Sequence, residues 1–135
     1  MKIGIKIQGN KAILKKVPEK VREFLEDEIA ATTSDIADDA RAKVRVDTGV
    51  LKGSIVDAAT GLNGEVNVGA KYAPYVEFGT GGLVNVPAGV EDYAIKFKGK
   101  GIKQVNLPPR PFLFPSFFDN INKMSERIKE EIESK

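Results

Sequence analysis

Hydrophobic and polar residues alternate at the start of the chain and then change to a helical period. Between Lys2 and Gln8 every second residue is an isoleucine, which is the pattern of a half-buried strand. Beyond Pro18 the apolar residues recur at steps of three and four, which indicates an amphipathic helix with one apolar stripe. The stripe consists of Val17, Val21, Phe24, Leu25, Ile29, Ile36, Ala40 and Val44. The helix starts at Pro18, whose missing N–H needs no partner in a first turn, or is kinked there if the preceding residues are already helical.

The polar residues Thr32–Asp35 lie within this helical pattern. Thr, Ser and Asp prefer helix caps to helix interiors, so the segment forms either one long helix or two pieces, although the apolar stripe runs through it. Acidic residues crowd the first half, and Arg41, Lys43 and Arg45 lie at the end, an order that complements the helix dipole. The pattern therefore predicts helical structure as far as about Val46.

Short β-type runs follow the helix. Ser54–Ala59 and Glu65–Gly69 flank the glycine-containing segment Thr60–Gly64, which predicts an antiparallel hairpin. Lys71–Phe78 then forms either a single helical turn or a bend, and Gly79 is its stop.

The stretch from Gly81 to Leu107 is the least regular part of the chain. It contains one plausible strand, Tyr93–Lys98, and is longer than an ordinary connection, so it is a functional arm or is disordered in the isolated protein. The stiff lead-in Pro108–Pro111 precedes a last helix, which Pro115 can open. The apolar stripe of that helix consists of Phe117, Phe118, Ile121, Met124, Ile128 and Ile132.

These elements predict an α+β fold. We expect a small, mostly antiparallel sheet packed by a long N-terminal helix and a C-terminal helix, with a long extended arm at about 81–107. No repeat or linker divides the chain, and 135 residues can bury a stable core, so we expect one domain, residues 1–135.

Composition removes several kinds of chemistry. The chain has no Cys and no His, so thiolate catalysis, Cys-type metal sites and the usual neutral-pH proton shuttle are missing. The net charge of +2, from 21 basic and 19 acidic residues, gives no global attraction to nucleic acid or to an anionic membrane. No segment has the pattern of a signal peptide or of a membrane span. We expect a soluble intracellular protein that binds no metal and no cofactor.

Asp47, Thr48 and Gly49 match the Asp-Thr-Gly signature of aspartic proteases, in which two such aspartates share a proton and activate a water. That signature follows an apolar strand, whereas Ala40–Val46 has the charge pattern of a helix end. The alternative is a turn, in which Asp47 or Thr48 bonds nearby N–H groups and Gly49 takes the tight position. We favour the turn, and the aspartic hydrolase stays an alternative.

The densest motif is Tyr72–Thr80, in which Tyr72, Tyr75 and Phe78 surround one carboxylate, Glu77. Burial could make Glu77 a general acid, but no second carboxylate or His lies nearby in the sequence. We therefore favour a structural ion pair between Glu77 and Arg110 or a lysine. The aromatic residues could stack on nucleic-acid bases, but without interleaved cations they fit a core better.

The highest density of positive charge lies in the arm. Lys96, Lys98, Lys100 and Lys103 fall within eight residues of sequence. They either belong to a solvated hairpin tip or attract phosphates or an acidic partner, and binding to phosphates would depend strongly on salt. A small protein that binds nucleic acid non-specifically through this arm is the second function we consider.

Three motifs in sequence order carry a resemblance to a known family. They are Asp-Thr-Gly-x-Leu-x-x-Ser-Ile at Asp47–Ile55, Tyr-Ala-x-Tyr-Val-Glu-Phe-Gly-Thr at Tyr72–Thr80, and Arg-Pro-Phe-Leu at Arg110–Leu113. With the long helix before them and the terminal helix after them, they resemble the gp-ten-like tail-component family of lambdoid phages, small neck and tail-completion proteins of long-tailed bacteriophages. Two features depart from the family: Arg45-Val46 replaces a proline often found before Asp-Thr-Gly, and the arm is long.

The resemblance implies a non-enzymatic virion assembly protein of the head-tail junction, in a phage or a prophage. Its partners would be copies of itself in a ring, a hexamer or a dodecamer, the connector or head-closure protein, and tail-terminator or tail-tube proteins. It would act in the host bacterial cytoplasm during assembly and then in the virion, with non-specific contact to DNA in the ring lumen. The motif residues would be structural: Asp47, Thr48, Gly49, Leu51, Tyr72, Tyr75, Glu77, Phe78, Gly79, Thr80, Arg110, Pro111 and Phe112.

Overall fold

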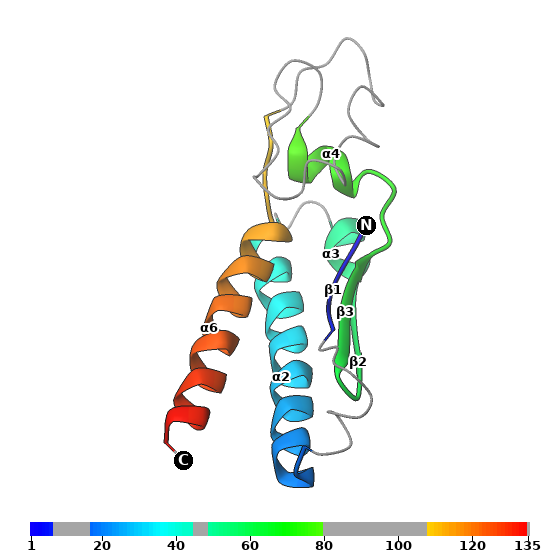
Figure 1. The fold of residues 1–135 in the computed structure, drawn as a ribbon. Coiled ribbons are helices and arrows are strands. Elements are labelled where there is room, and N and C mark those ends of the chain that lie inside the picture. Colours follow the sequence, from blue (N-terminus) through cyan, green and yellow to red (C-terminus); the bar gives the residue numbers. More distant parts are fainter. Residues whose placement is uncertain (7–16, 45–48, 80–107, 135) are drawn as a thin grey trace.

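The computed structural model describes residues 1–6, 17–44, 49–79 and 108–134. Its elements are β1 (Lys2–Lys6), α2 (Glu19–Lys43), α3 (Gly49–Gly53), β2 (Ile55–Thr60), β3 (Asn63–Val68), α4 (Ala73–Phe78) and α6 (Phe114–Glu133). The three strands form one antiparallel sheet in the order β1-β3-β2. The long helix α2 lies between this sheet and α6 (Figure 1). The predicted α+β class, with a small antiparallel sheet and two long helices, is confirmed.

Helix α2 is one continuous helix of 25 residues that begins directly after Pro18. The polar segment that could have divided it remains helical because its buried hydroxyls have partners. Thr33 Oγ1 donates a hydrogen bond to the Ile29 carbonyl (2.7 Å), and Thr32 Oγ1 accepts one from Arg127 of α6 (3.0 Å). Threonine in a helix interior is therefore compatible with burial here, since neither hydroxyl is left unsatisfied.

The sheet packs its apolar face on α2. Ile5, Ile55, Val66 and Val68 are buried in the main core cluster together with Ile29 and Ile36 of the helix. The alternation predicted for the first strand is confirmed, and so is the predicted antiparallel hairpin. β1 is described only as far as Lys6, so the rest of the predicted strand lies outside the described residues.

The hairpin turn is tighter than predicted. It consists of Gly61 and Leu62 alone, and Gly61 has φ +57°, which favours glycine at the first position of a two-residue turn. Gly64, predicted to lie in the connection, is part of β3. A side chain at Gly64 would overlap Thr33 Oγ1 and lie 3.0 Å from Ile29 Cγ2. The absent side chain lets α2 cross β3 at close range.

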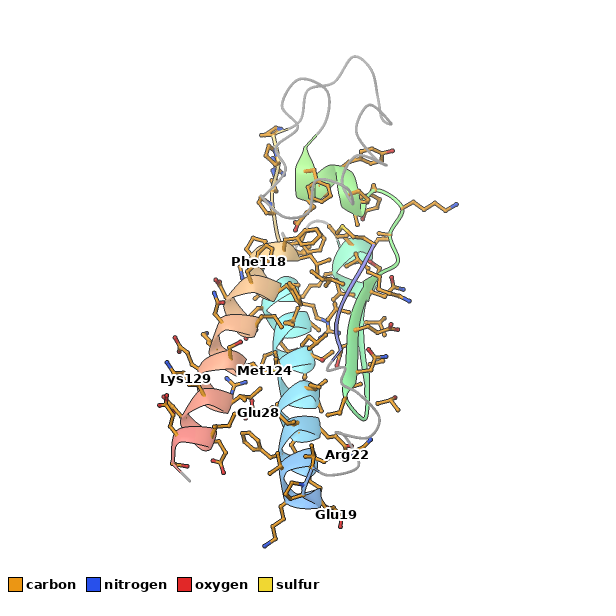
Figure 2. The ribbon with its side chains drawn as sticks, in the orientation of Figure 1. Glu19, Arg22, Glu28, Phe118, Met124 and Lys129 are labelled. Carbon is orange, nitrogen blue, oxygen red and sulfur yellow. The ribbon has the colours of Figure 1, made fainter. Side chains whose placement is uncertain are left out.

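Helix α6 packs along α2 through a row of polar contacts. Lys43 Nζ donates to Ser116 Oγ (2.9 Å), Asn120 Nδ2 donates to Asp39 (2.7 Å), and Arg127 Nε donates to Glu28 (2.8 Å). Met124 is the one residue of the predicted α6 stripe that is buried, and it lies on the side that faces α2 (Figure 2). Phe117, Ile121 and Ile128 are partly buried, whereas Phe118 is 39% exposed and Ile132 is 70% exposed. The predicted stripe is thus only partly covered, because the face that meets α2 carries Ser116, Asn120 and Arg127.

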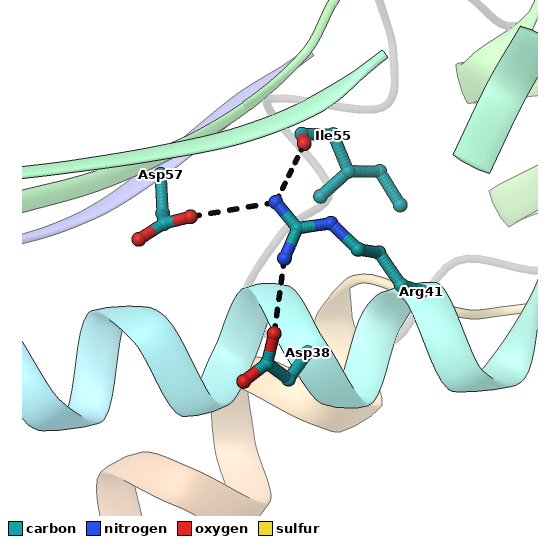
Figure 3. A network of polar contacts seen from close by, with 4 residues as sticks. All are labelled: Asp38, Arg41, Ile55 and Asp57. Carbon is teal, nitrogen blue, oxygen red and sulfur yellow. Dashed lines mark hydrogen bonds and ion pairs between the residues drawn. The ribbon is translucent and has the colours of Figure 1, made fainter. Parts of the chain in front are cut away.

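Arg41 ties the end of α2 to β2, an edge strand of the sheet. Its guanidinium donates to the Ile55 carbonyl (2.8 Å) and contacts Asp57 (3.4 Å) and Asp38 (3.0 Å), as Figure 3 shows. The planar guanidinium has enough donors to serve all three partners at once. A charged side chain therefore occupies part of the edge of β2 that faces away from β3.

Two sequence predictions fall outside this description. The arm at 81–107 and its strand Tyr93–Lys98 lie outside the described residues.

Of the helices that the structure describes, none combines the length and apolarity needed to cross a membrane.

Candidate functional site

The central motif folds into the short helix α4, which begins with Pro74 in its first turn. Gly79 ends the helix with φ +82°, and its N–H bonds the Tyr75 carbonyl (2.9 Å). A positive φ is readily adopted by glycine, so the stop predicted at this position is confirmed. Of the two predicted forms, helical turn or bend, the segment takes the first.

The carboxylate of Glu77 lies in the interior and binds the chain that enters α6. The residue is 1% exposed, and its two oxygens accept hydrogen bonds from three successive backbone N–H groups. The donors are Phe112 (2.6 Å), Leu113 (3.1 Å and 3.3 Å to the two oxygens) and Phe114 (2.6 Å). Leu113, the N-cap residue of α6, supplies no side-chain cap of its own. Glu77 therefore satisfies donors at a helix start that would otherwise have no acceptor.

Opposing effects act on the charge of Glu77. Burial raises the pKa of the Glu77 carboxyl above its ordinary value, while the hydrogen bonds from Phe114, Phe112 and Leu113 and the positive charge of Lys43 lower it. Burial is the largest of these effects, so the net shift is upward. Three backbone N–H groups already bond the two oxygens of this carboxylate. It is therefore suited to fix the start of α6 in place, and few lone pairs remain to bind a substrate.

Further bonds close the contact between α4 and the start of α6. The Arg110 N–H bonds the Val76 carbonyl (2.7 Å), and the rings of Phe78 and Phe114 lie 5.6 Å apart. On the other side, Ser116 Oγ accepts from Lys43 and donates to the Phe112 carbonyl (2.7 Å). We call this set of contacts around Glu77 the α4–α6 seam.

The structure brings several of the predicted motif residues together. Leu51 of α3 and Phe112 are buried in the main core cluster, beside Ala73 of α4 and Leu113. Glu77 and Phe78 join the same region through Phe114. The second and third motifs are therefore in direct contact, and the first contributes Leu51 to the same core.

Other motif residues are peripheral or are not described. Gly49, Tyr72, Arg110 and Pro111 are exposed and Tyr75 is half-buried. The residues outside the described ranges are Asp47, Thr48, Thr80, Lys96, Lys98, Lys100 and Lys103. The chain before Asp47 is helical as far as Lys43, which differs from the apolar strand that an aspartic-protease signature requires.

The partner predicted for Glu77 was wrong in kind. We expected a cation, Arg110 or a lysine, but the hydrogen-bond partners of Glu77 in the described chain are backbone N–H groups. Arg110 contributes its backbone N–H to Val76, and Lys43 acts on Glu77 through charge alone. Sequence reasoning missed Leu113, Phe114, Lys43 and Ser116. One signal in the sequence could have indicated Leu113 and Phe114. No Ser, Thr, Asp or Asn lies in the lead-in directly before Pro115, so the N–H groups at the helix start lack a local side-chain acceptor.

No group of three or more acidic side chains within the described ranges is arranged to hold a metal ion. Every buried side-chain nitrogen and oxygen in these ranges has a hydrogen-bond partner. The seam is thus a fully satisfied polar contact that joins two segments far apart in the sequence.

Comparison with known proteins identifies one family. The family model described as "Bacteriophage HK97-gp10, putative tail-component" matches residues 11–79. This range is just over half of the chain and includes α2, α3, the β2–β3 hairpin and α4. No curated protein and no solved structure matches the chain.

Proposed function

This chain belongs to the HK97-gp10 tail-component family of bacteriophages, and we propose that it is a neck or tail-completion protein that forms a ring at the head-tail junction of a long-tailed phage or prophage. The family match over residues 11–79 is the observation that carries the proposal. The third motif, Arg110–Leu113, lies beyond that match and supports it, because this motif packs directly on Glu77 within the match.

The α4–α6 seam supports an assembly role for residues 80–107. Gly79 and Pro108 are the residues at which this segment leaves and rejoins the described chain. The bonds of Val76 and Glu77 to Arg110 and Phe112 hold those two points next to each other. In our proposal the residues Asp47–Leu51, which include the start of α3, and the helix α4 pack against Arg110–Leu113, and together they present the segment to partners.

The proposed partners are the structures on either side of a neck ring. They are neighbouring copies in a hexamer or dodecamer, the connector or head-closure protein, and a tail-terminator or tail-tube protein. Ring formation requires heterologous contacts, in which one surface of a subunit meets a different surface of the next. The protein would assemble in the host cytoplasm without catalysing a reaction. Lys96, Lys98, Lys100 and Lys103 would contact either an acidic partner surface or the phosphates of DNA in the lumen.

Electron microscopy tests this proposal. The purified protein would be imaged alone and after mixing with the connector and tail proteins encoded beside it, with mass measured by light scattering. We expect rings, either alone or on the partner, whose subunit number the images give directly. Strictly monomeric protein at high concentration and in both mixtures would overturn the proposal.

A further inference from the structure

One end of the α2–α6 pair projects past the sheet. Gly64, which lies beside the hairpin turn, packs against Ile29 and Thr33, so the part of α2 before Ile29 extends beyond the turn (Figure 1). α6 runs antiparallel to α2, and Arg127 reaches Glu28 and Thr32. We call residues 19–28 of α2 and 128–133 of α6 the overhang. Figure 2 shows Glu19 and Arg22 at this end and Phe118 at the opposite end of the pair.

The apolar stripes of both helices continue into the overhang, where the described chain covers them only partly. Val21 is 38% exposed and Ile132 is 70% exposed, and Phe24, Leu25 and Ile128 are half-buried. The same two stripes are fully buried at Ile29, Ile36 and Met124, where the sheet or the other helix covers them. Apolar surface of this kind is typical of a binding site for another chain.

The overhang is also rich in negative charge. Its acidic side chains at or near the surface include Glu19, Glu23, Asp27, Glu130 and Glu133. Three nearby cations already form ion pairs with acidic side chains: Arg22 with Glu26 (3.2 Å), Arg127 with Glu28 (2.8 Å) and Lys129 with Glu133 (4.0 Å). Glu23 and Asp27 have no ion-pair partner among the residues that the structure describes. The surface therefore fits a partner that combines apolar side chains with positive charge.

We propose that the overhang is the docking surface for residues 80–107 of a neighbouring copy of this chain. This inference rests on the proposed ring and identifies the two surfaces that meet within it. The segment carries the required chemistry, because Lys96, Lys98, Lys100 and Lys103 are interspersed with Ile95, Phe97 and Ile102. Cations next to apolar residues match an acidic, half-exposed apolar surface.

The length of the segment is sufficient for this contact. Its two ends are held together at the α4–α6 seam, so its reach is that of half its residues, ~45 Å when fully extended. The 20-residue helix α6 is ~30 Å long at the rise of an α-helix. Residues 80–107 can therefore extend from the seam of one copy along the helix pair of the next.

The positions of the two surfaces suit a ring. The seam and the overhang lie at opposite ends of the molecule (Figure 1). A contact between the segment of one copy and the overhang of the next is heterologous, and repeating it gives a ring when the rotation closes.

Disulfide trapping tests the contact directly, because the chain has no Cys and each introduced thiol is unique. One variant carries Val21→Cys and the other Lys98→Cys, and the two are mixed under mild oxidation. We expect a covalent dimer that contains one chain of each variant, joined by the disulfide between Cys at position 21 of one and Cys at position 98 of the other. A matched control replaces Val21→Cys with Val56→Cys, an exposed valine on the sheet, and should give at least tenfold less of the mixed dimer.

Charge reversal gives a second, independent measurement. Glu23→Lys with Asp27→Lys should weaken self-association in sedimentation by tenfold or more, and Lys96→Glu with Lys98→Glu in the partner copy should restore it. Asp35→Lys, at an exposed position on the same helix but outside the overhang, should leave association unchanged.

The outcomes separate this inference from the proposed function. Rings that form while both the trapping and the charge rescue fail would overturn the docking surface and leave the ring standing. A double variant with both thiols in one chain that closes only within itself would assign the segment to its own overhang and would also overturn the inference. No association under any condition would overturn the ring itself.

Discussion

Glu77 is stable in the interior because backbone N–H groups replace the water that its carboxylate loses. A buried carboxylate is costly unless it is fully hydrogen-bonded, and here three donors converge on it. The donors belong to one turn of chain at the start of α6, where four N–H groups of any helix lack partners within the helix. One side chain thus compensates both its own burial and an uncapped helix.

Replacing Glu77 with alanine should destabilise the fold. Three buried N–H groups would lose their acceptor, and each such loss costs about 1–3 kcal/mol, so we expect a total loss of at least about 3 kcal/mol. Glu77→Gln keeps one carbonyl oxygen and should cost less. Glu65→Gln is the matched control, because Glu65 is a half-exposed partner of Lys2 and its replacement should change stability by less than about 0.5 kcal/mol. Urea unfolding gives the free energy of unfolding of all three variants. A Glu77→Ala variant as stable as the Glu65→Gln control would contradict the capping role.

The titration of Glu77 should appear in the pH dependence of stability. Burial raises its pKa in the folded protein, so the folded state holds the proton more tightly than the unfolded state does. The stability that Glu77 contributes is then fully present below the unfolded pKa and is lost as pH rises through the folded pKa. We expect the difference in unfolding free energy between wild type and Glu77→Gln to fall as pH rises above the ordinary glutamate pKa of about 4.3 and through the raised pKa of folded Glu77. A difference that grows with pH would mean that the hydrogen bonds outweigh burial.

At the scale of elements, the sequence was sufficient to predict a helix or strand wherever its apolar residues recur periodically and form a buried face. Alternating isoleucines identified β1, and the three-and-four spacing identified α2 as far as its last turn. The seam could not be predicted in the same way, because the donors to Glu77 are backbone groups and carry no residue signature. The hairpin connection was predicted too long for a related reason: the role of Gly64 depends on Thr33, a contact between distant parts of the sequence.

The close crossing of α2 over β3 predicts a strong effect of Gly64→Ala. The new methyl group would overlap Thr33 Oγ1, and overpacking of this kind costs about 1–3 kcal/mol. Thr33→Ala in the same chain should recover part of that loss, because it removes the overlapping atom. Gly53→Ala is the control, since its added methyl group meets nothing within 4 Å. Thermal unfolding of the wild type and the three variants provides the measurement, and equal effects of Gly64→Ala and Gly53→Ala would contradict the crossing.

At the scale of the whole molecule, the two edges of the sheet carry charge that discourages pairing with another strand. β1 presents Lys2, which is paired with Glu65, and β2 has Arg41 bound to its Ile55 carbonyl and to Asp57. Charged residues at an edge hinder the approach of a further strand. Contacts between copies are therefore better placed on the helix pair than on the sheet.

Association through the overhang should weaken with salt. The contact joins acidic and lysine-rich surfaces that are exposed to solvent, and such attraction is screened within a Debye length of ~10 Å at 0.1 M salt. We expect the dissociation constant for self-association to rise at least ~10-fold between low salt and ~0.5 M NaCl. Sedimentation at several protein concentrations measures it, and a constant that does not change with salt would indicate a purely apolar contact.

The seam also determines how freely the length of residues 80–107 can vary. Val76 and Glu77 bind the returning chain, so the fold needs the two ends of the segment to meet and sets no requirement on the path between them. The entropy of closing a loop grows only with the logarithm of its length, ~0.6 kcal/mol for each doubling. The same scaffold can therefore carry a shorter or longer segment at almost constant stability, which makes this segment the exchangeable part of the molecule.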